Sequence, residues 1–199
     1  METKDVAVVS KNISEKVLAK VTEFQKNGAL TLPKDYSPEN ALKSAFLILS
    51  ETKDSNKQLV LQSCSEASIA NTLLDMVVRG LSPLKKQYYF IPYSGKLQGQ
   101  PSYFGNIATA KRVNPNVKEI VANVIFNDDI FEYGINTETG KYSIKKHETK
   151  LENIDLDSIK GAYAIVLLND GNSYPVIMTM KQIRRSWEMG QTKGQSQAH

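Results

Sequence analysis

Lysines and arginines stand beside aromatic residues at three places in this sequence. Single-stranded nucleic acid is held by this combination, because cations contact its phosphates while flat rings stack on its bases, at about 1–3 kcal/mol per stacked base. The three clusters are Lys85, Lys86, Tyr89 and Tyr93, then Tyr103, Asn106, Lys111 and Arg112, then Lys181, Arg184, Arg185 and Trp187. Three clusters in one small chain favour binding of single-stranded nucleic acid.

Each cluster also has a purely structural explanation. Lysines at the start of a strand are usually solvated, and Trp187 would serve as a helix anchor. Alternation along the strand-like run YYFIPY buries one set of side chains whatever the function. Strand parity divides this run into Tyr88, Phe90 and Pro92 on one face and Tyr89, Ile91 and Tyr93 on the other. We expect only one of these faces to pack under helices.

Few residues are available for metal binding or nucleophilic catalysis. The chain has two histidines, His147 and His199, and a single cysteine, Cys64, which excludes an internal disulfide and a cysteine-based zinc site. No HExxH motif is present. A serine or cysteine triad would have to use His147, which we expect to be solvated or to cap the end of a charged strand. The sequence therefore predicts no bound metal and no catalytic residue.

Nucleotide-hydrolysing chemistry also lacks its usual residues. Neither a GxxxxGK[ST] loop nor a GxGxxG motif after a parallel strand is present. Asp128, Asp129 and Glu132 suggest a metal-dependent nuclease as an alternative. Adjacent carboxylates on a strand point to opposite faces, however, and Asn127 with Asp128 is typical of a turn between strands. We therefore expect a binding protein that is not an enzyme and needs no cofactor.

Composition and charge set the broad class. The chain has 199 residues, of which 41% are hydrophobic, and a formal net charge of +4. This length and composition predict a globular body with a core. No apolar run approaches the ~18 residues of a membrane span, and the first residues lack a signal-peptide pattern. We expect a cytoplasmic protein without a membrane partner.

Helical patterns fill the first part of the chain. Residues 12–28 carry an apolar stripe of Ile13, Val17, Val21 and Phe24, with Asn12 or Ser14 as the cap and Gly28 as the stop. Ser37 and Pro38 mark the start of a second helix, since serine caps and proline at the first position both favour it. A third helix is predicted from Ser65 to Gly80.

Strand patterns dominate after Gly80. The run 87–93 is strand-like, 93–100 resembles a turn or hairpin tip, and a short strand is expected to lead into a helix from about Gly105 to Arg112. Further strands are expected at 117–126, 131–135, 142–147, 161–168 and 173–179, the last two joined by the hairpin turn NDGN. Thr179 is expected to cap a final helix. The fold class is therefore α+β, with N-terminal helices followed by antiparallel hairpins and a packed helix.

The domain organisation follows from these patterns. We expect a loose leader over 1–11, a single domain over 12–189 that contains the three binding clusters, and a disordered tail over 190–199. Within the domain, 12–80 is the helical part and 81–189 contains the sheet.

The order of six motifs resembles that of RecT-type phage recombinases, in the RecT/Red beta superfamily. GLSPLKKQYYFIPY is similar to the family's helix end and tyrosine-rich strand, and SYFGNIATAKR to its short strand, glycine and basic helix. VKEIVANVIFNDDIFEY is similar to its strand pair around an Asn-Asp turn, and YSIKKHE to its strand ending in histidine. KGAYAIVLLNDG resembles its Ala-Tyr-Ala strand with hairpin, and MTMKQIRRSW its closing helix. The likeness covers roughly residues 30–190.

This resemblance implies a protein of phage-type homologous recombination that anneals single-stranded DNA without ATP. Its partners would be single-stranded DNA, annealed duplex DNA, further copies of itself in a ring or helical filament, a 5′-to-3′ exonuclease and the host single-strand-binding protein. A phage or prophage gene acting in the cytoplasm of a bacterial host is implied. The alternatives are a coat protein that binds single-stranded DNA without annealing it, and a structural phage component that contacts only protein.

Overall fold

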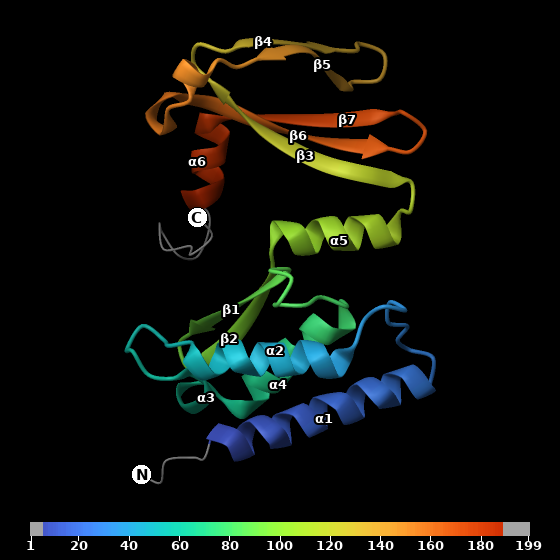
Figure 1. Ribbon diagram of the computed structural model, residues 1–199, viewed down its shortest axis with the longest axis vertical. Coiled ribbons are helices and arrows are strands. Elements are labelled where there is room, and N and C mark those ends of the chain that lie inside the picture. The colour runs from blue at the N-terminus through green and yellow to red at the C-terminus, as the bar shows by residue number, and fades with distance from the viewer. Residues whose placement is uncertain (1–5, 189–199) are drawn as a thin grey trace. The chain divides into compact units, whose positions relative to one another are not determined.

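The chain folds into two compact units, Met1–Arg112 and Val113–His199, here called the N-terminal unit and the C-terminal unit. The computed structural model describes residues 6–188, with side chains over residues 12–188 (Figure 1). The predicted tail, 190–199, therefore lies outside the described residues, as does His199. That residues 12–189 act as one annealing domain stays a prediction.

The N-terminal unit is built on four helices: α1 (Val6–Lys26), α2 (Pro38–Glu51), α3 (Val60–Ser63) and α4 (Glu66–Val78). Their start and stop signals are local. The Ser37 hydroxyl accepts from the Asn40 N–H and Ser65 caps α4 in the same way, while Gly28 follows α1 with a φ of 74°. The predicted stripe of α1 is confirmed for Ile13, Val17 and Val21, which are buried in one core with residues of the other three helices, whereas Phe24 is half-buried.

A β-hairpin and a fifth helix complete the N-terminal unit. Strands β1 (Tyr88–Tyr93) and β2 (Lys96–Pro101) pair antiparallel, and α5 (Tyr103–Val113) follows directly. Ser94 and Gly95 both have positive φ, as the tight turn between the strands requires. Leu81, Tyr88 and Leu97 belong to the same core as the four helices. The predicted helical part, 12–80, therefore shares its core with the hairpin.

Three sequence predictions about element boundaries are wrong. α1 begins at Val6, ahead of the expected cap at Asn12 or Ser14, because residues 6–11 contain no proline or glycine to stop the helix. The segment after Tyr93 is mostly strand β2 instead of a flexible tip. Tyr103 and Phe104 form the first turn of α5 instead of a strand.

The C-terminal unit contains two antiparallel sheets. β3 (Val117–Phe126), β6 (Ile159–Leu168) and β7 (Ser173–Thr179) form one sheet with β6 in the centre, and β4 (Ile130–Ile135) pairs with β5 (Tyr142–Glu148) in the other. The NDGN hairpin is confirmed as the β6–β7 connection. β3 and β4 flank the expected Asn127-Asp128 turn, but they do not pair with each other.

The central sheet of this unit is covered from both sides. The β4–β5 hairpin and α6 (Met180–Glu188) lie on opposite sides of it (Figure 1). Two 3₁₀ turns, η1 (Leu151–Asn153) and η2 (Leu156–Ser158), connect β5 to β6. The α+β fold class is confirmed. Over residues 6–188, none of the helices combines the length and the apolar character needed to cross a membrane.

Candidate nucleic-acid interface

Strand β1 divides its side chains between the core and the surface as parity predicts. Tyr88 is buried and Phe90 half-buried, whereas Tyr89, Ile91 and Tyr93 are 43%, 39% and 53% exposed. Their pairing partners on the neighbouring strand point to the same side and are polar. We call this surface the hairpin face; it consists of Tyr89, Ile91, Tyr93, Lys96, Gln98 and Gln100. Two tyrosines therefore lie open to solvent beside a lysine and two amides.

Tyr88 fixes the buried side of the hairpin. Its hydroxyl donates to Asp75 Oδ2 at 2.6 Å, and the Arg79 guanidinium donates to the same carboxylate at 2.9 Å. Burial and the contact with Asp75 together raise the pKa of Tyr88 well above its usual range. Gly99 on β2, diagonal to Tyr88, leaves the space that the Tyr88 ring occupies. Tyr88 is therefore a structural anchor, and it holds the hairpin face in place.

The two lysines of the first cluster lie in a rigid, exposed turn. Gln87 closes it, since the Gln87 N–H donates to Ser82 O and the Gln87 side-chain carbonyl accepts from the Ser82 N–H. Lys86 has a φ of 54° at the end of this turn. We call Leu84, Lys85 and Lys86 the lysine turn; all three side chains are exposed.

Ser102 joins the lysine turn to the start of α5. Its side chain is buried; the hydroxyl donates to Lys86 O at 2.6 Å and accepts from the Gly105 N–H at 3.1 Å. The Ser102 N–H donates to Gln87 O at 3.0 Å. The first two predicted clusters therefore converge at one place, where β1 begins, β2 ends and α5 begins.

The first turn of α5 presents two neighbouring aromatic rings, tilted by 33° to each other, at this junction. Tyr103 and Phe104 are 63% and 43% exposed, and their ring centroids lie 3.9 Å apart. Asn106 and Lys111 are exposed further along the helix. An exposed aromatic pair next to two lysines is suited to stacking on bases whose phosphates the lysines contact.

Arg112, at the far end of α5, is tied to the helical core. Its guanidinium lies against Gly80, which the Pro33 ring also approaches. It also faces Tyr36, whose hydroxyl donates to Leu81 O. Burial raises the pKa of Tyr36 above its usual range, and the positive charge of Arg112 opposes that rise. Arg112 therefore has a packing role in addition to the phosphate contact predicted for it.

The third cluster lies on α6, in the C-terminal unit. Thr179 caps this helix as predicted, because its hydroxyl accepts from the Gln182 N–H while the Gln182 side chain accepts from the Thr179 N–H. Lys181, Arg184 and Arg185 are exposed, and Trp187 is 57% exposed. α6 therefore presents a basic surface with an accessible indole.

A buried polar network in the C-terminal unit was missed by sequence reasoning. Asp129, whose side chain is fully buried, accepts from the Phe126 N–H at 2.8 Å, His147 Nε2 at 3.1 Å, the Thr149 hydroxyl at 3.0 Å and Asn153 Nδ2 at 3.2 Å. His147 Nδ1 lies 3.0 Å from the Tyr163 hydroxyl. The network is built from β3, β5, β6 and the connections that follow β3 and β5.

This network corrects the prediction for His147. The side chain is only 14% exposed and bridges Asp129 to Tyr163, so it neither is solvated nor merely caps a strand. Burial of the Asp129 carboxylate would raise its pKa, but the Phe126 N–H, His147, Asn153 and Thr149 outweigh that effect and lower it to about 2. Asp129 is therefore an ionised structural residue.

The same network occupies one of the carboxylates that a metal-dependent nuclease would need as a metal ligand. Asp129 faces inward with its oxygens taken by protein donors, while Asp128 and Glu132 are exposed. Among the described residues, no group of three or more histidine, cysteine, aspartate or glutamate side chains is placed to hold a metal ion.

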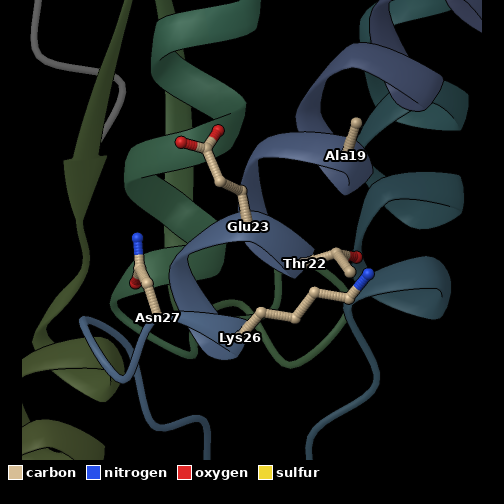
Figure 2. Close-up of a pocket in the computed structure, with 5 residues that line it drawn as sticks. All are labelled: Ala19, Thr22, Glu23, Lys26 and Asn27. Atoms are coloured by element: carbon tan, nitrogen blue, oxygen red, sulfur yellow. The ribbon is translucent and has the colours of Figure 1, made fainter.

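A shallow depression on α1 is lined by none of the residues of the three clusters. It is lined by Ala19, Thr22, Glu23, Lys26 and Asn27, which share one stripe of the helix (Figure 2). Glu23 forms a salt bridge with Lys20 at 2.9 Å, and Thr22 donates to Leu18 O. Because its polar groups are largely satisfied locally, this depression offers no site of its own.

Comparison with known proteins identifies the chain's relatives at the level of the family. No curated protein matches the sequence. The family model described as "RecT family" matches residues 39–199, which is most of the chain and includes all three basic–aromatic clusters. The motif order in the sequence, the α+β fold and this match agree, and the chain belongs to the RecT family.

Proposed function

We propose that this protein binds single-stranded DNA without sequence preference along a basic surface and pairs it with a complementary strand, without ATP. RecT proteins take part in phage-type recombination and annealing, which supports this proposal. The observation that carries it is the junction at Ser102, where the lysine turn, the hairpin face and the Tyr103–Phe104 pair converge.

The chemistry of the junction suits annealing better than sequence readout. Lys85, Lys86 and Lys111 would neutralise phosphates, while Tyr89 and Tyr103 would contact sugars or stack on bases at intervals. Non-specific binding of this kind holds the backbone. Base edges would stay available to an incoming strand. The basic helix α6, with Arg184 and Arg185, would extend the phosphate contacts.

The proposal includes an assembly and its partners. A homo-oligomer, in a ring or a helical filament, would align many such surfaces along one strand. A 5′-to-3′ exonuclease would supply the single-stranded DNA, and the host single-strand-binding protein would compete for it. Family membership supports a phage or prophage gene that acts in recombination and DNA repair in the bacterial cytoplasm.

Annealing of two complementary oligonucleotides, without ATP or divalent metal, tests the proposal. The native protein should accelerate duplex formation and retain the duplex. Lys85→Gln with Lys86→Gln should weaken DNA binding by about tenfold or more, since two phosphate contacts are lost. The matched control is Lys53→Gln with Lys57→Gln, another exposed pair in the N-terminal unit that also includes one lysine with positive φ.

The outcomes separate the alternatives. DNA binding without faster pairing would identify a coat protein, and absence of DNA binding at low salt would favour a structural phage component. Degradation of labelled DNA in the presence of magnesium or manganese would support the nuclease alternative. Equal effects of the two lysine pairs would remove the lysine turn from the site.

A further inference from the structure

The connection between β5 and β6 carries aliphatic side chains that are strongly exposed. Leu151, Ile154 and Leu156 are 87%, 55% and 84% exposed. Glu152, Asp155 and Asp157 alternate with them and are also exposed. We call residues 151–157 the acidic knob. Exposed leucines lose the stabilisation that burial would give, so a contiguous group of them marks an interaction surface.

The acidic knob is ordered by hydrogen bonds to the body of its unit. Asn153 donates to the buried carboxylate of Asp129 at 3.2 Å, and Ser158 donates to Asn153 O at 3.4 Å. The Ile154 N–H donates to Leu151 O at 3.2 Å, and Asp155 caps η2. The half-buried Asn153 holds the backbone of the knob, while the two leucines are exposed. A preordered surface loses less entropy when it binds.

The chemistry of the knob defines its partner. Three carboxylates beside three aliphatic groups fit a surface that is both basic and aliphatic. The nearest cation to them along the chain, Lys150, lies 3.8 Å from Glu152, and both side chains are 75% exposed. The chain itself has such a surface. In the lysine turn, Leu84 is 77% exposed beside Lys85 and Lys86. The two surfaces carry opposite charge and the same type of apolar group.

We propose that the acidic knob of one copy docks onto the lysine turn of a second copy, and that single-stranded DNA displaces it. The knob and the turn are different patches, so the contact is heterologous and extends into a ring or an open helix. The carboxylates of the knob and the phosphates of DNA compete for Lys85 and Lys86. The contact therefore belongs to the DNA-free assembly. This proposal rests on the oligomer and on the DNA role of the lysine turn in the proposed function.

Self-association of the full chain without DNA, followed by sedimentation or mass photometry, tests the contact. Leu151→Ser with Leu156→Ser should raise the concentration for half-assembly by about tenfold or more, because the contact between copies would no longer bury these two leucines. Glu152→Gln with Asp157→Gln should raise it as well. Both variants should bind short oligothymidylate more tightly, by about two- to tenfold, since a competitor for the lysines is removed.

Matched controls come from exposed residues elsewhere. Leu47→Ser replaces a leucine that is 71% exposed on α2, and Glu132→Gln with Glu138→Gln removes two exposed carboxylates from the same unit. Neither should change half-assembly by more than about twofold.

Charge reversal gives the sharpest result. A chain with Lys85→Glu and Lys86→Glu, and a second chain with Glu152→Lys and Asp157→Lys, should each fail to assemble alone. Their equimolar mixture should assemble, because every contact in the alternating series then pairs opposite charges.

Native protein that is monomeric without DNA, a leucine variant that assembles normally, or a mixture that stays unassembled would overturn the proposal. Loss of oligothymidylate binding in the leucine variant would overturn the displacement step. Native protein that assembles but binds no DNA would instead contradict the proposed function.

Discussion

At the scale of single residues, Asp129 is the acceptor at the centre of the polar network in the C-terminal unit. It lies at the end of β3 and collects donors from a backbone amide, a histidine, a threonine and an asparagine. One of these donors, Asn153, belongs to the acidic knob. The carboxylate therefore holds together the two sheets and the connection that precedes β6.

Replacement of Asp129 by alanine should destabilise the C-terminal unit by about 2–3 kcal/mol, because its donors are left without an acceptor. Its folded-state pKa is about 2, below the usual 3.8. The stabilisation is therefore complete above the pKa of the unfolded carboxyl and is lost as the pH falls through about 2. Urea unfolding followed by fluorescence of Trp187, the single tryptophan, reports on this unit.

Asp128→Ala is the control for that measurement, since Asp128 is exposed and should contribute less than about 0.5 kcal/mol. The difference between native protein and the Asp129→Ala variant should shrink from neutral pH toward pH ~2. A difference that is absent at neutral pH, or constant throughout, would contradict the structural role of Asp129.

The network shows which residue roles a sequence can predict. The parity of Tyr88 and Tyr89 is confirmed, because alternation along one strand is a local property. The roles of His147 and Asp129 were not predicted, because their partners lie up to 24 residues away in the sequence, as Asn153 does from Asp129. Side-chain contacts across sheets have no local signature.

At the scale of elements, α5 is the helix that positions most of the candidate interface. Ser102 caps it, and Gly105 lets its first turn lie against the backbone carbonyl of Gln87. Any side chain at position 105 would meet that carbonyl. The close approach brings Tyr103 and Phe104 to the lysine turn.

Gly105→Ala should therefore change the free energy of unfolding in the direction opposite to the usual one. Glycine to alanine within a helix normally stabilises it by about 0.8–1.0 kcal/mol. Here the added methyl group should cost about 1–3 kcal/mol, because a backbone carbonyl has to move. Binding of single-stranded DNA should weaken as the lysine turn shifts. Urea unfolding and oligothymidylate titration measure the two effects, and a stabilised variant with native affinity would contradict the close approach.

The boundaries of elements were predictable where a cap and a pattern agree. Ser37 with Pro38, and Thr179 with Gln182, mark helices correctly, since each signal lies within four residues. The start of α5 was missed because Tyr103 and Phe104 have the β-propensity of a strand, and the Ser102 cap decided otherwise. The pairing of β3 with β6 was not predictable, because their sequences contain no register signal.

At the scale of the whole molecule, each of the two units carries candidate DNA contacts of its own. The lysine turn and α5 belong to the N-terminal unit, whereas α6 belongs to the C-terminal unit. If both units contact one bound strand, each contributes its own phosphate contacts. The dependence of affinity on salt counts these contacts directly.

The last prediction uses this count. For single strands, the logarithm of the binding constant falls with the logarithm of salt with a slope of about −0.7 per neutralised phosphate. Lys85→Gln with Lys86→Gln should make this slope shallower by about 1.4, and Arg184→Gln with Arg185→Gln should do the same. The four changes together should make the slope shallower by about 2.8, because each neutralised phosphate contributes separately to it. Titration of oligothymidylate over a range of potassium chloride concentrations measures all three values, with Lys53→Gln and Lys57→Gln as the control pair. An unchanged slope for the arginine pair would restrict the DNA site to the N-terminal unit, since charges that leave the salt dependence unaltered do not contact phosphate.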